Sequence, residues 1–191
     1  MNKPKTKENT MKAEAFVSVD IETSGPVPGI FSLLSIGACF ISDPSKSIYL
    51  ELCPDSLKHD PEAVAVTGLD LKELQNTGLP PKEAMLKLKK WLDQECPAEH
   101  TIVFVGLNTP FDWSFINYHF HKSIGFNPFG FTAIDIKSYY MGASACSWKE
   151  TKSSHMKIRF NTQQTPNHNA LDDALFQAEL FSLMLAENQN R

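Results

Sequence analysis

Two acidic residues, Asp20 and Glu22, interrupt a short hydrophobic segment and carry the chemistry that this sequence offers most plainly. In residues 16–22 apolar and polar side chains alternate, and this period of two predicts a β-strand. Side chains two positions apart on a strand point to the same face, so the two carboxylates should lie side by side, about 6.6 Å apart at their roots. Because burying unpaired charge is unfavourable by several kcal/mol, we expect a divalent cation between them. An exposed edge strand with ordinary surface acids is the alternative.

Two further acids and a histidine stand near the expected starts of helices. Asp112 occupies the capping-box position of a helix for which Thr109 is the expected N-cap. Asp173 lies in the first turn of the last expected helix, shortly after His168. Taken alone, each acid could simply favour the positive end of its helix, an effect of about 0.3–1 kcal/mol. Taken with the two strand acids, they form a set of carboxylates of the kind that Mg²⁺ and Mn²⁺ prefer.

The composition sets the frame for these residues. A chain of 191 residues with 42% hydrophobic side chains can bury a full core. We expect a disordered tail at residues 1–12 and a single domain at residues 13–188. The net charge of -4 argues against tight, sequence-indifferent binding to long nucleic acid. The four cysteines form no C-x-x-C, no secretory signal is recognisable and no apolar run approaches the roughly 20 residues of a membrane helix, so we expect free thiols, no membrane contact and a cytoplasmic protein.

The hydrophobic patterns predict a mixed α/β order of elements. Strands are expected at residues 16–22, 32–41, 47–53 and 101–106. Turn residues Asp43, Pro44 and Ser45 predict a hairpin, so the second and third strands should be antiparallel. Helices are expected at residues 60–74 in short pieces, 80–94, from 110 onward and 169–187.

Two segments are less regular. Residues 132–140 predict a helix or a short strand that runs into one, and residues 143–166 predict a long loop with room for a short element. Three strands followed by helices, with one more buried strand between helices, indicate a mixed sheet with helices on both faces.

Three motifs occur in order along the chain, namely VDIETSG at 19–25, LNTPFDWSF at 107–115 and HNALDDA at 168–174. Together they resemble the DEDDh 3′-to-5′ exonucleases, the group that contains polymerase proofreading subunits such as the epsilon subunit of DNA polymerase III, RNase T and oligoribonuclease. The resemblance spans residues 16 to about 181. It implies an exonuclease domain with an RNase H-like fold, a mixed five-stranded sheet in which strands 1–3 are antiparallel and the others parallel.

The resemblance also implies roles for single residues. The implied metal-binding acids are Asp20, Glu22, Asp112 and Asp173, and the implied general base is His168. Two Mg²⁺ or Mn²⁺ ions about 3.5–4 Å apart can stabilise both the attacking and the leaving oxygen of a phosphodiester. Such a site would release 5′-mononucleotides from single-stranded DNA or RNA 3′ ends. Helical periodicity does not choose between Asp172 and Asp173, and the family spacing selects Asp173.

The sequence leaves open the roles of several further residues, the substrate and the oligomeric state. Substrate contacts are expected from Thr23, Ser24, Asn108 and Phe111, although Phe111 could equally belong to the core. Five basic residues within 149–159 could bind phosphates or form a solvated loop. The alternatives to a DNA exonuclease are an enzyme for short RNA oligonucleotides and a catalytically silent module that binds nucleic acid or a partner. The sequence leaves the oligomeric state open, a homodimer included, and indicates no polymerase partner.

Overall fold

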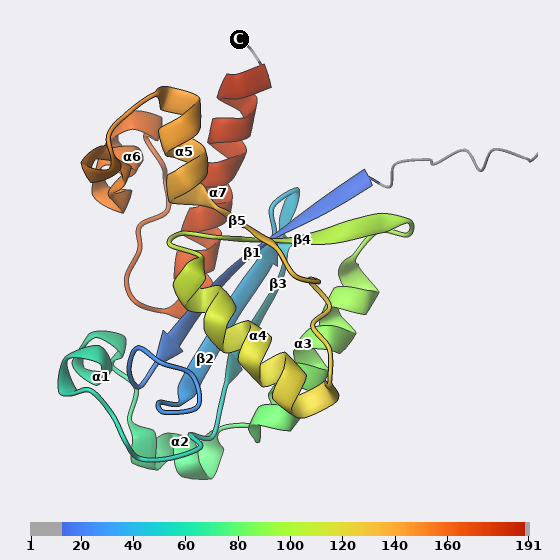
Figure 1. Cartoon of the computed structure of the whole chain (residues 1–191), viewed down its shortest axis with the longest axis vertical. Helices are drawn as coiled ribbons and strands as arrows, with labels where there is room; N and C mark the ends of the chain where they lie inside the picture. Colours follow the sequence, from blue (N-terminus) through green and yellow to red (C-terminus); the bar gives the residue numbers. More distant parts are fainter. Residues whose placement is uncertain (1–12, 190–191) are drawn as a thin grey trace, which may run out of the picture.

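A five-stranded mixed sheet forms the centre of the computed structural model, which describes residues 13–189 (Figure 1). The strands are β1 (Ala13–Thr23), β2 (Leu33–Phe40), β3 (Asp43–Glu51), β4 (His100–Gly106) and β5 (Ala133–Asp135). Their order across the sheet is β3-β2-β1-β4-β5. β1 and β3 pair antiparallel with β2, whereas β1–β4 and β4–β5 are parallel, so the predicted sheet is confirmed. The tail predicted at residues 1–12 lies outside the described residues.

Helices cover both faces of this sheet, as predicted. They are α1 (Pro61–Thr67), α2 (Leu71–Thr77), α3 (Pro81–Glu95), α4 (Pro110–Ile124), α5 (Ile136–Ser144), α6 (Ser153–Phe160) and α7 (Ala170–Gln189), with a short 3-10 helix η1 (Trp148–Thr151). α3 and α4 pack on one face, and α5, α6 and α7 gather on the other (Figure 1). Within the part of the chain that the structure describes, no helix combines the length and the apolar character needed to cross a membrane.

The alternation in β1 decides which face of the sheet carries the acids. Val17, Val19 and Ile21 are buried in the core formed with α3 and α4. The residues between them point the opposite way, toward the side that α7 covers. Asp20 and Glu22 therefore stand on the α7 side of the sheet, at the carboxyl end of β1.

Gly37 allows α7 to begin directly on the sheet. It lies in β2 as the register partner of Asp20. A Cβ atom built at Gly37 would clash with the backbone of Ala170, the first residue of α7. A side chain at this position would therefore push the start of α7 off the sheet, and with it Asp173.

Gly37→Ala is accordingly expected to destabilise the protein and weaken the site. Overpacking of this kind is unfavourable by about 1–3 kcal/mol, which lowers the melting temperature by several degrees in a chain of this size. Gly142→Ala is the matched control, because a Cβ atom at Gly142 in α5 meets nothing within 4 Å and alanine favours helix. Thermal unfolding of both variants checks this, and equal melting temperatures would contradict the close approach.

The residues predicted to begin α1 and α4 differ in the capping bonds that they make. Asp60 caps α1, Pro61 is its first residue and Gly68 ends it, all as predicted. Thr109 is the N-cap residue of α4, as predicted, but its own backbone is helical and its side chain makes no capping bond. Its hydroxyl instead lies 2.7 Å from the Gly106 carbonyl oxygen and 2.9 Å from that of Ile134. The capping box predicted there does not form, and the Asp112 carboxylate is available for another use.

Two connections also differ from the prediction. The β2–β3 turn is at residues 41–42, and the residues 43–45 predicted to form it belong to β3, which ends before residue 53. The loop predicted at 143–166 contains η1 and α6. Met156 is the one buried residue of α6, so the helix leaves almost no apolar periodicity in the sequence. Residues 132–140 form the short strand β5 and then α5, the second of the two predicted alternatives.

Candidate active site

The five candidate residues come together at the carboxyl end of β1. Asp20 and Glu22 are at that end, Asp112 is in the first turn of α4, and Asp173 is in the first turn of α7. His168 immediately precedes α7. Figure 1 shows that β1 ends where α4 and α7 begin. Three segments that are far apart in the sequence thus supply one cluster of acids.

Glu22, His168 and Asp173 form the tightest part of this cluster. Each offers one ligand atom, and these atoms lie within 4.8 Å of one another. Asp173 is only 9% exposed, Glu22 is partly buried and His168 is exposed. The three side chains therefore line a site with a protein floor and an opening to solvent.

The pKa values of the acids reflect their crowding. Burial raises the pKa of Asp20 well above its ordinary value, and the charges of Asp112, Asp173 and Glu22 raise it further. Burial raises the pKa of Asp112 in the same way, against hydrogen bonds from its own backbone and that of Ile21. Burial, followed by the charge of Asp173, raises the pKa of Glu22 to about 8. The pKa of Asp173 is raised too, again chiefly by burial.

The donor set fits divalent metal ions. No ion pair formed within residues 13–189 involves any of the four acids. Four carboxylates without a cationic side chain repel one another, and bound dications would remove that repulsion. Carboxylate oxygens are the ligands that hard divalent cations prefer. The cluster therefore has both the charge and the ligand chemistry for divalent ions.

A tight turn presents His168 to the cluster. His168 has a positive φ of 63°, in the left-handed region. On one side of it, the Asn167 backbone N–H donates to Asp173 Oδ1 at 2.8 Å. On the other side, Asn169 Oδ1 accepts from the Leu171 backbone N–H at 3.0 Å and so caps α7. The Asp173 carboxylate thus also fixes the turn that carries the histidine.

The structure separates the two neighbouring acids of α7. Asp173 points into the cluster, whereas the Asp172 carboxylate accepts from Asn167 Nδ2 at 2.7 Å in an exposed contact. Asp172 thus lies outside the group of ligand atoms that contains Asp173. The geometry favours the choice of Asp173 that the family spacing makes.

Gln177 is a buried polar residue at the site that sequence reasoning did not identify. Its Nε2 donates to Asp20 Oδ1 at 2.6 Å, and its Oε1 accepts from the Leu107 backbone N–H at 3.0 Å. It follows Asp173 by four residues, so the two side chains share one face of α7. That spacing was the only signal available in the sequence.

The predicted substrate-contact residues lie around the cluster in different settings. The Thr23 hydroxyl donates to the Gly25 carbonyl at 3.0 Å, and the Ser24 hydroxyl donates to that of Lys58 at 2.9 Å. The Thr23 hydroxyl hydrogen is thus used within the turn after β1, and that of Ser24 ties this turn to the segment before α1. Asn108 is exposed with a φ of 65°, and Phe111 is partly buried and packs on the core beside Phe115. Their contacts with substrate stay predictions.

The basic residues of the 149–159 segment are partly engaged within the protein. Arg159 forms an ion pair with Glu187 at 2.8 Å and hydrogen-bonds to the Ser144 hydroxyl. Lys157 donates to the Thr165 hydroxyl at 2.6 Å. These contacts favour a structural role for the two side chains over a grip on phosphates.

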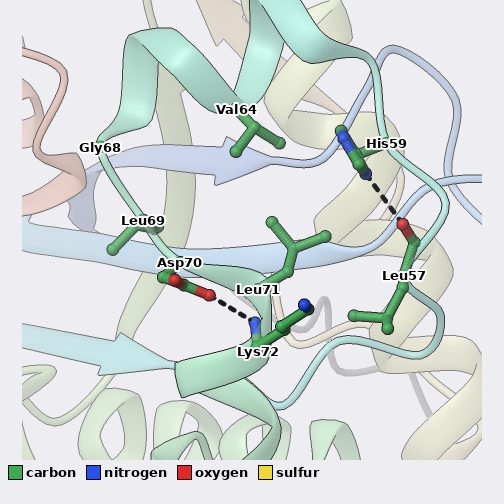
Figure 2. A pocket seen from close by; sticks show the side chains of 8 residues that line it. All are labelled: Leu57, His59, Val64, Gly68, Leu69, Asp70, Leu71 and Lys72. Carbon is green, nitrogen blue, oxygen red and sulfur yellow. Dashed lines mark hydrogen bonds between the residues drawn. The ribbon is translucent and has the colours of Figure 1, made fainter.

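A separate cavity of about 520 Å³ lies beside α1 and α2 (Figure 2). Its lining residues are Leu57, His59, Val64, Gly68, Leu69, Asp70, Leu71 and Lys72. None of the five candidate residues lines it, and its walls are mostly apolar. The acid cluster, and not this cavity, holds the groups that could perform chemistry on a phosphodiester.

The raised pKa values predict how metal changes the stability of the protein. The folded-state pKa of Glu22 is about 8 against an ordinary value of 4.5, so without metal the folded state binds more protons than the unfolded state between these values. Stability without metal should therefore fall as the pH rises through this window. Metal needs ionised carboxylates, so added Mn²⁺ should raise the melting temperature more at about pH 8 than at about pH 5.5. Glu22→Gln should flatten this dependence, and a pH-independent gain would contradict it.

Comparisons with known proteins agree with this arrangement. A protein-family model described as exonuclease matches residues 17–181 of this sequence. The Escherichia coli 3′-5′ DNA exonuclease Cap18 is 50% identical over 171 residues, which are 90% of this chain and 91% of that protein. The nuclease domain of 3′hExo, a DEDDh family member solved with rAMP bound, is 14% identical with a TM-score of 0.77, covering 93% of this chain and 94% of that one. The zinc-bound E. coli ExoI–ssDNA complex is 16% identical with a TM-score of 0.73, covering 94% of this chain and 42% of that one.

The family match spans most of the chain and includes all five candidate residues. The half-identical relative extends over nearly the full length of both proteins, and the solved structures share the fold. Enzymes of this family use divalent metal ions, which the carboxylate cluster fits. The chain belongs to the exonuclease family and is a 3′-to-5′ exonuclease of nucleic acid, as its resemblance to the DEDDh enzymes implied.

Proposed function

We propose that this exonuclease removes 5′-mononucleotides one at a time from the 3′ ends of single-stranded DNA, with two divalent ions held by its four clustered acids. The observation that carries the proposal is the meeting of Glu22, His168 and Asp173 ligand atoms within 4.8 Å, beside Asp20 and Asp112. Mg²⁺ and Mn²⁺ are the ions that an all-carboxylate ligand set favours.

The side chains of the cluster would have different roles in the reaction. All four acids, Asp20, Glu22, Asp112 and Asp173, would hold the metal ions. The bound ions would stabilise the charge that develops on the attacking and leaving oxygens of the phosphodiester. His168 would accept a proton from the attacking water, and its exposed position lets that proton pass on to solvent.

The relative that is 50% identical is named a DNA exonuclease, which supports DNA over RNA as the substrate. Single-stranded ends are supported by the E. coli ExoI–ssDNA complex, whose fold is similar. Short RNA oligonucleotides stay the second candidate. A catalytically silent module is disfavoured, because four uncompensated carboxylates at one site would only destabilise a protein that did not use metal.

Incubation of the protein with 5′-labelled DNA and RNA oligomers tests the proposal, with Mg²⁺, with Mn²⁺ or with EDTA. We expect stepwise shortening of the labelled DNA with either metal and none with EDTA. A double-stranded blunt-ended DNA serves as the control for strand preference. Faster shortening of the RNA than of the DNA would identify RNA as the preferred substrate. Binding of either oligomer without cleavage would favour the silent module.

A further inference from the structure

Gln177 connects two parts of the site through the two ends of its side-chain amide. Nε2 donates to Asp20 Oδ1 at 2.6 Å, and Oε1 accepts from the Leu107 backbone N–H at 3.0 Å. The side chain is 2% exposed, so water does not replace either contact. We infer that Gln177 is a positioning residue that holds the Asp20 carboxylate and the turn after β4 in the arrangement that binds metal. This inference rests on the proposed function, because it assumes that Asp20 is a metal ligand.

The direction of the Gln177 amide follows from its partners. A backbone N–H can only donate, so the amide atom that faces Leu107 must be the oxygen. An ionised carboxylate can only accept, so the atom that faces Asp20 must be the nitrogen. Both contacts require the same orientation, and a flipped amide would lose both. The pair of contacts therefore locks the side chain, and the locked side chain orients Asp20.

The chemistry of an amide suits this position. A lysine or arginine would also donate to Asp20, but its charge would offset the negative charge that attracts a cation. Gln177 donates without adding charge. One hydrogen bond to Oδ1 leaves Oδ2 of Asp20 and the remaining lone pairs free for metal. Partners that hydrogen-bond to metal ligands fix the orientation of those ligands in metal sites generally.

Gln177 lies in α7, so the support that it gives to Asp20 depends on the position of this helix. Residue 177 lies one helical turn after Asp173, on the same face of α7. The start of α7 thus supplies a metal ligand at Asp173 and the support of a second ligand at Gln177. Leu107, the other partner, directly precedes Asn108 and the helix that carries Asp112. A single side chain therefore links the three segments that build the site.

Gln177→Met tests the inference, because methionine keeps the length and apolar contacts of the side chain but removes both hydrogen bonds. Mn²⁺ binding to the protein without nucleic acid is measured by isothermal titration calorimetry. We expect the dissociation constant to rise about tenfold, the size typical of lost support for a metal ligand. We also expect kcat to fall at limiting Mn²⁺ and to recover at excess Mn²⁺, with the KM for DNA unchanged.

Met184→Ala is the matched control, since it removes buried volume from α7 two turns further on without contacting the acids. It should lower the melting temperature and leave Mn²⁺ binding unchanged. Equal Mn²⁺ affinity in wild type and Gln177→Met, or equal weakening in Met184→Ala, would overturn the positioning role. If Gln177→Met does not fold, Gln177→Asn carries the same test, because its shorter amide cannot reach both partners. Wild-type protein that binds no Mn²⁺ would instead refute the proposed function.

Discussion

Asp173→Asn is expected to lower the metal-dependent exonuclease rate by on the order of 10³-fold, whereas Asp172→Asn should keep most of it. Loss of one charged ligand removes several kcal/mol of charge stabilisation from the transition state, which corresponds to this factor in rate. Asparagine keeps an oxygen that can accept from the Asn167 backbone N–H, so the turn before α7 should survive. The rate at which a 5′-labelled single-stranded DNA oligomer is shortened at saturating Mg²⁺ measures the effect.

The two substitutions form a matched pair, because they replace neighbouring acids of one helix by the same residue. Asp173→Asn also removes one charge from a crowded cluster, so in EDTA the melting temperature of this variant should equal or exceed that of wild type. That result would separate loss of a ligand from loss of the fold. A larger loss of rate in Asp172→Asn would reject the assignment of Asp173.

His168→Gln is expected to lower kcat by about 10²- to 10⁴-fold, the range that a general base contributes. The side chain lies close enough to Glu22 and Asp173 to be a metal ligand as well, so the rate alone does not define its role. A general base should be dispensable for metal binding. We therefore expect His168→Gln to bind Mn²⁺ nearly as tightly as wild type, as measured by calorimetry without nucleic acid.

His155→Gln is the control, since His155 is an exposed histidine in α6 with no place in the cluster. It should leave both kcat and Mn²⁺ binding unchanged. A parallel loss of Mn²⁺ affinity and rate in His168→Gln would make His168 a ligand and leave the reaction without an identified base.

The parts of the fold that could be predicted have strong local causes. The alternation of apolar and polar residues in β1 predicts that Asp20 and Glu22 lie on one face of the strand, and in the folded sheet they do. Asp60, Pro61 and Gly68 delimit α1 because each has one dominant preference at a helix end. Strand alternation and helix starts single out the four acids, but their meeting with His168 in one site was implied by the resemblance to a known family and follows from no local pattern.

The parts that could not be predicted depend on contacts between distant segments. The Thr109 hydroxyl contacts the carbonyl oxygen of Ile134 in β5, and no local rule anticipates that a tertiary contact replaces the side-chain capping bond of an N-cap residue. The sequence of α6 shows no helical pattern of apolar residues because this helix buries a single side chain. Gln177 looks like an ordinary helical glutamine until Asp20, 157 residues earlier in the chain, is placed beside it.

The placement of α7 has a consequence for the newly synthesised protein. His168, Asp173 and Gln177 all belong to the last part of the described chain, and they complete a site begun by β1 and α4. Before residue 168 has been added, the growing polypeptide holds at most three of the five groups, namely Asp20, Glu22 and Asp112. Nuclease activity is therefore expected to start only once α7 has been synthesised and has docked on the sheet.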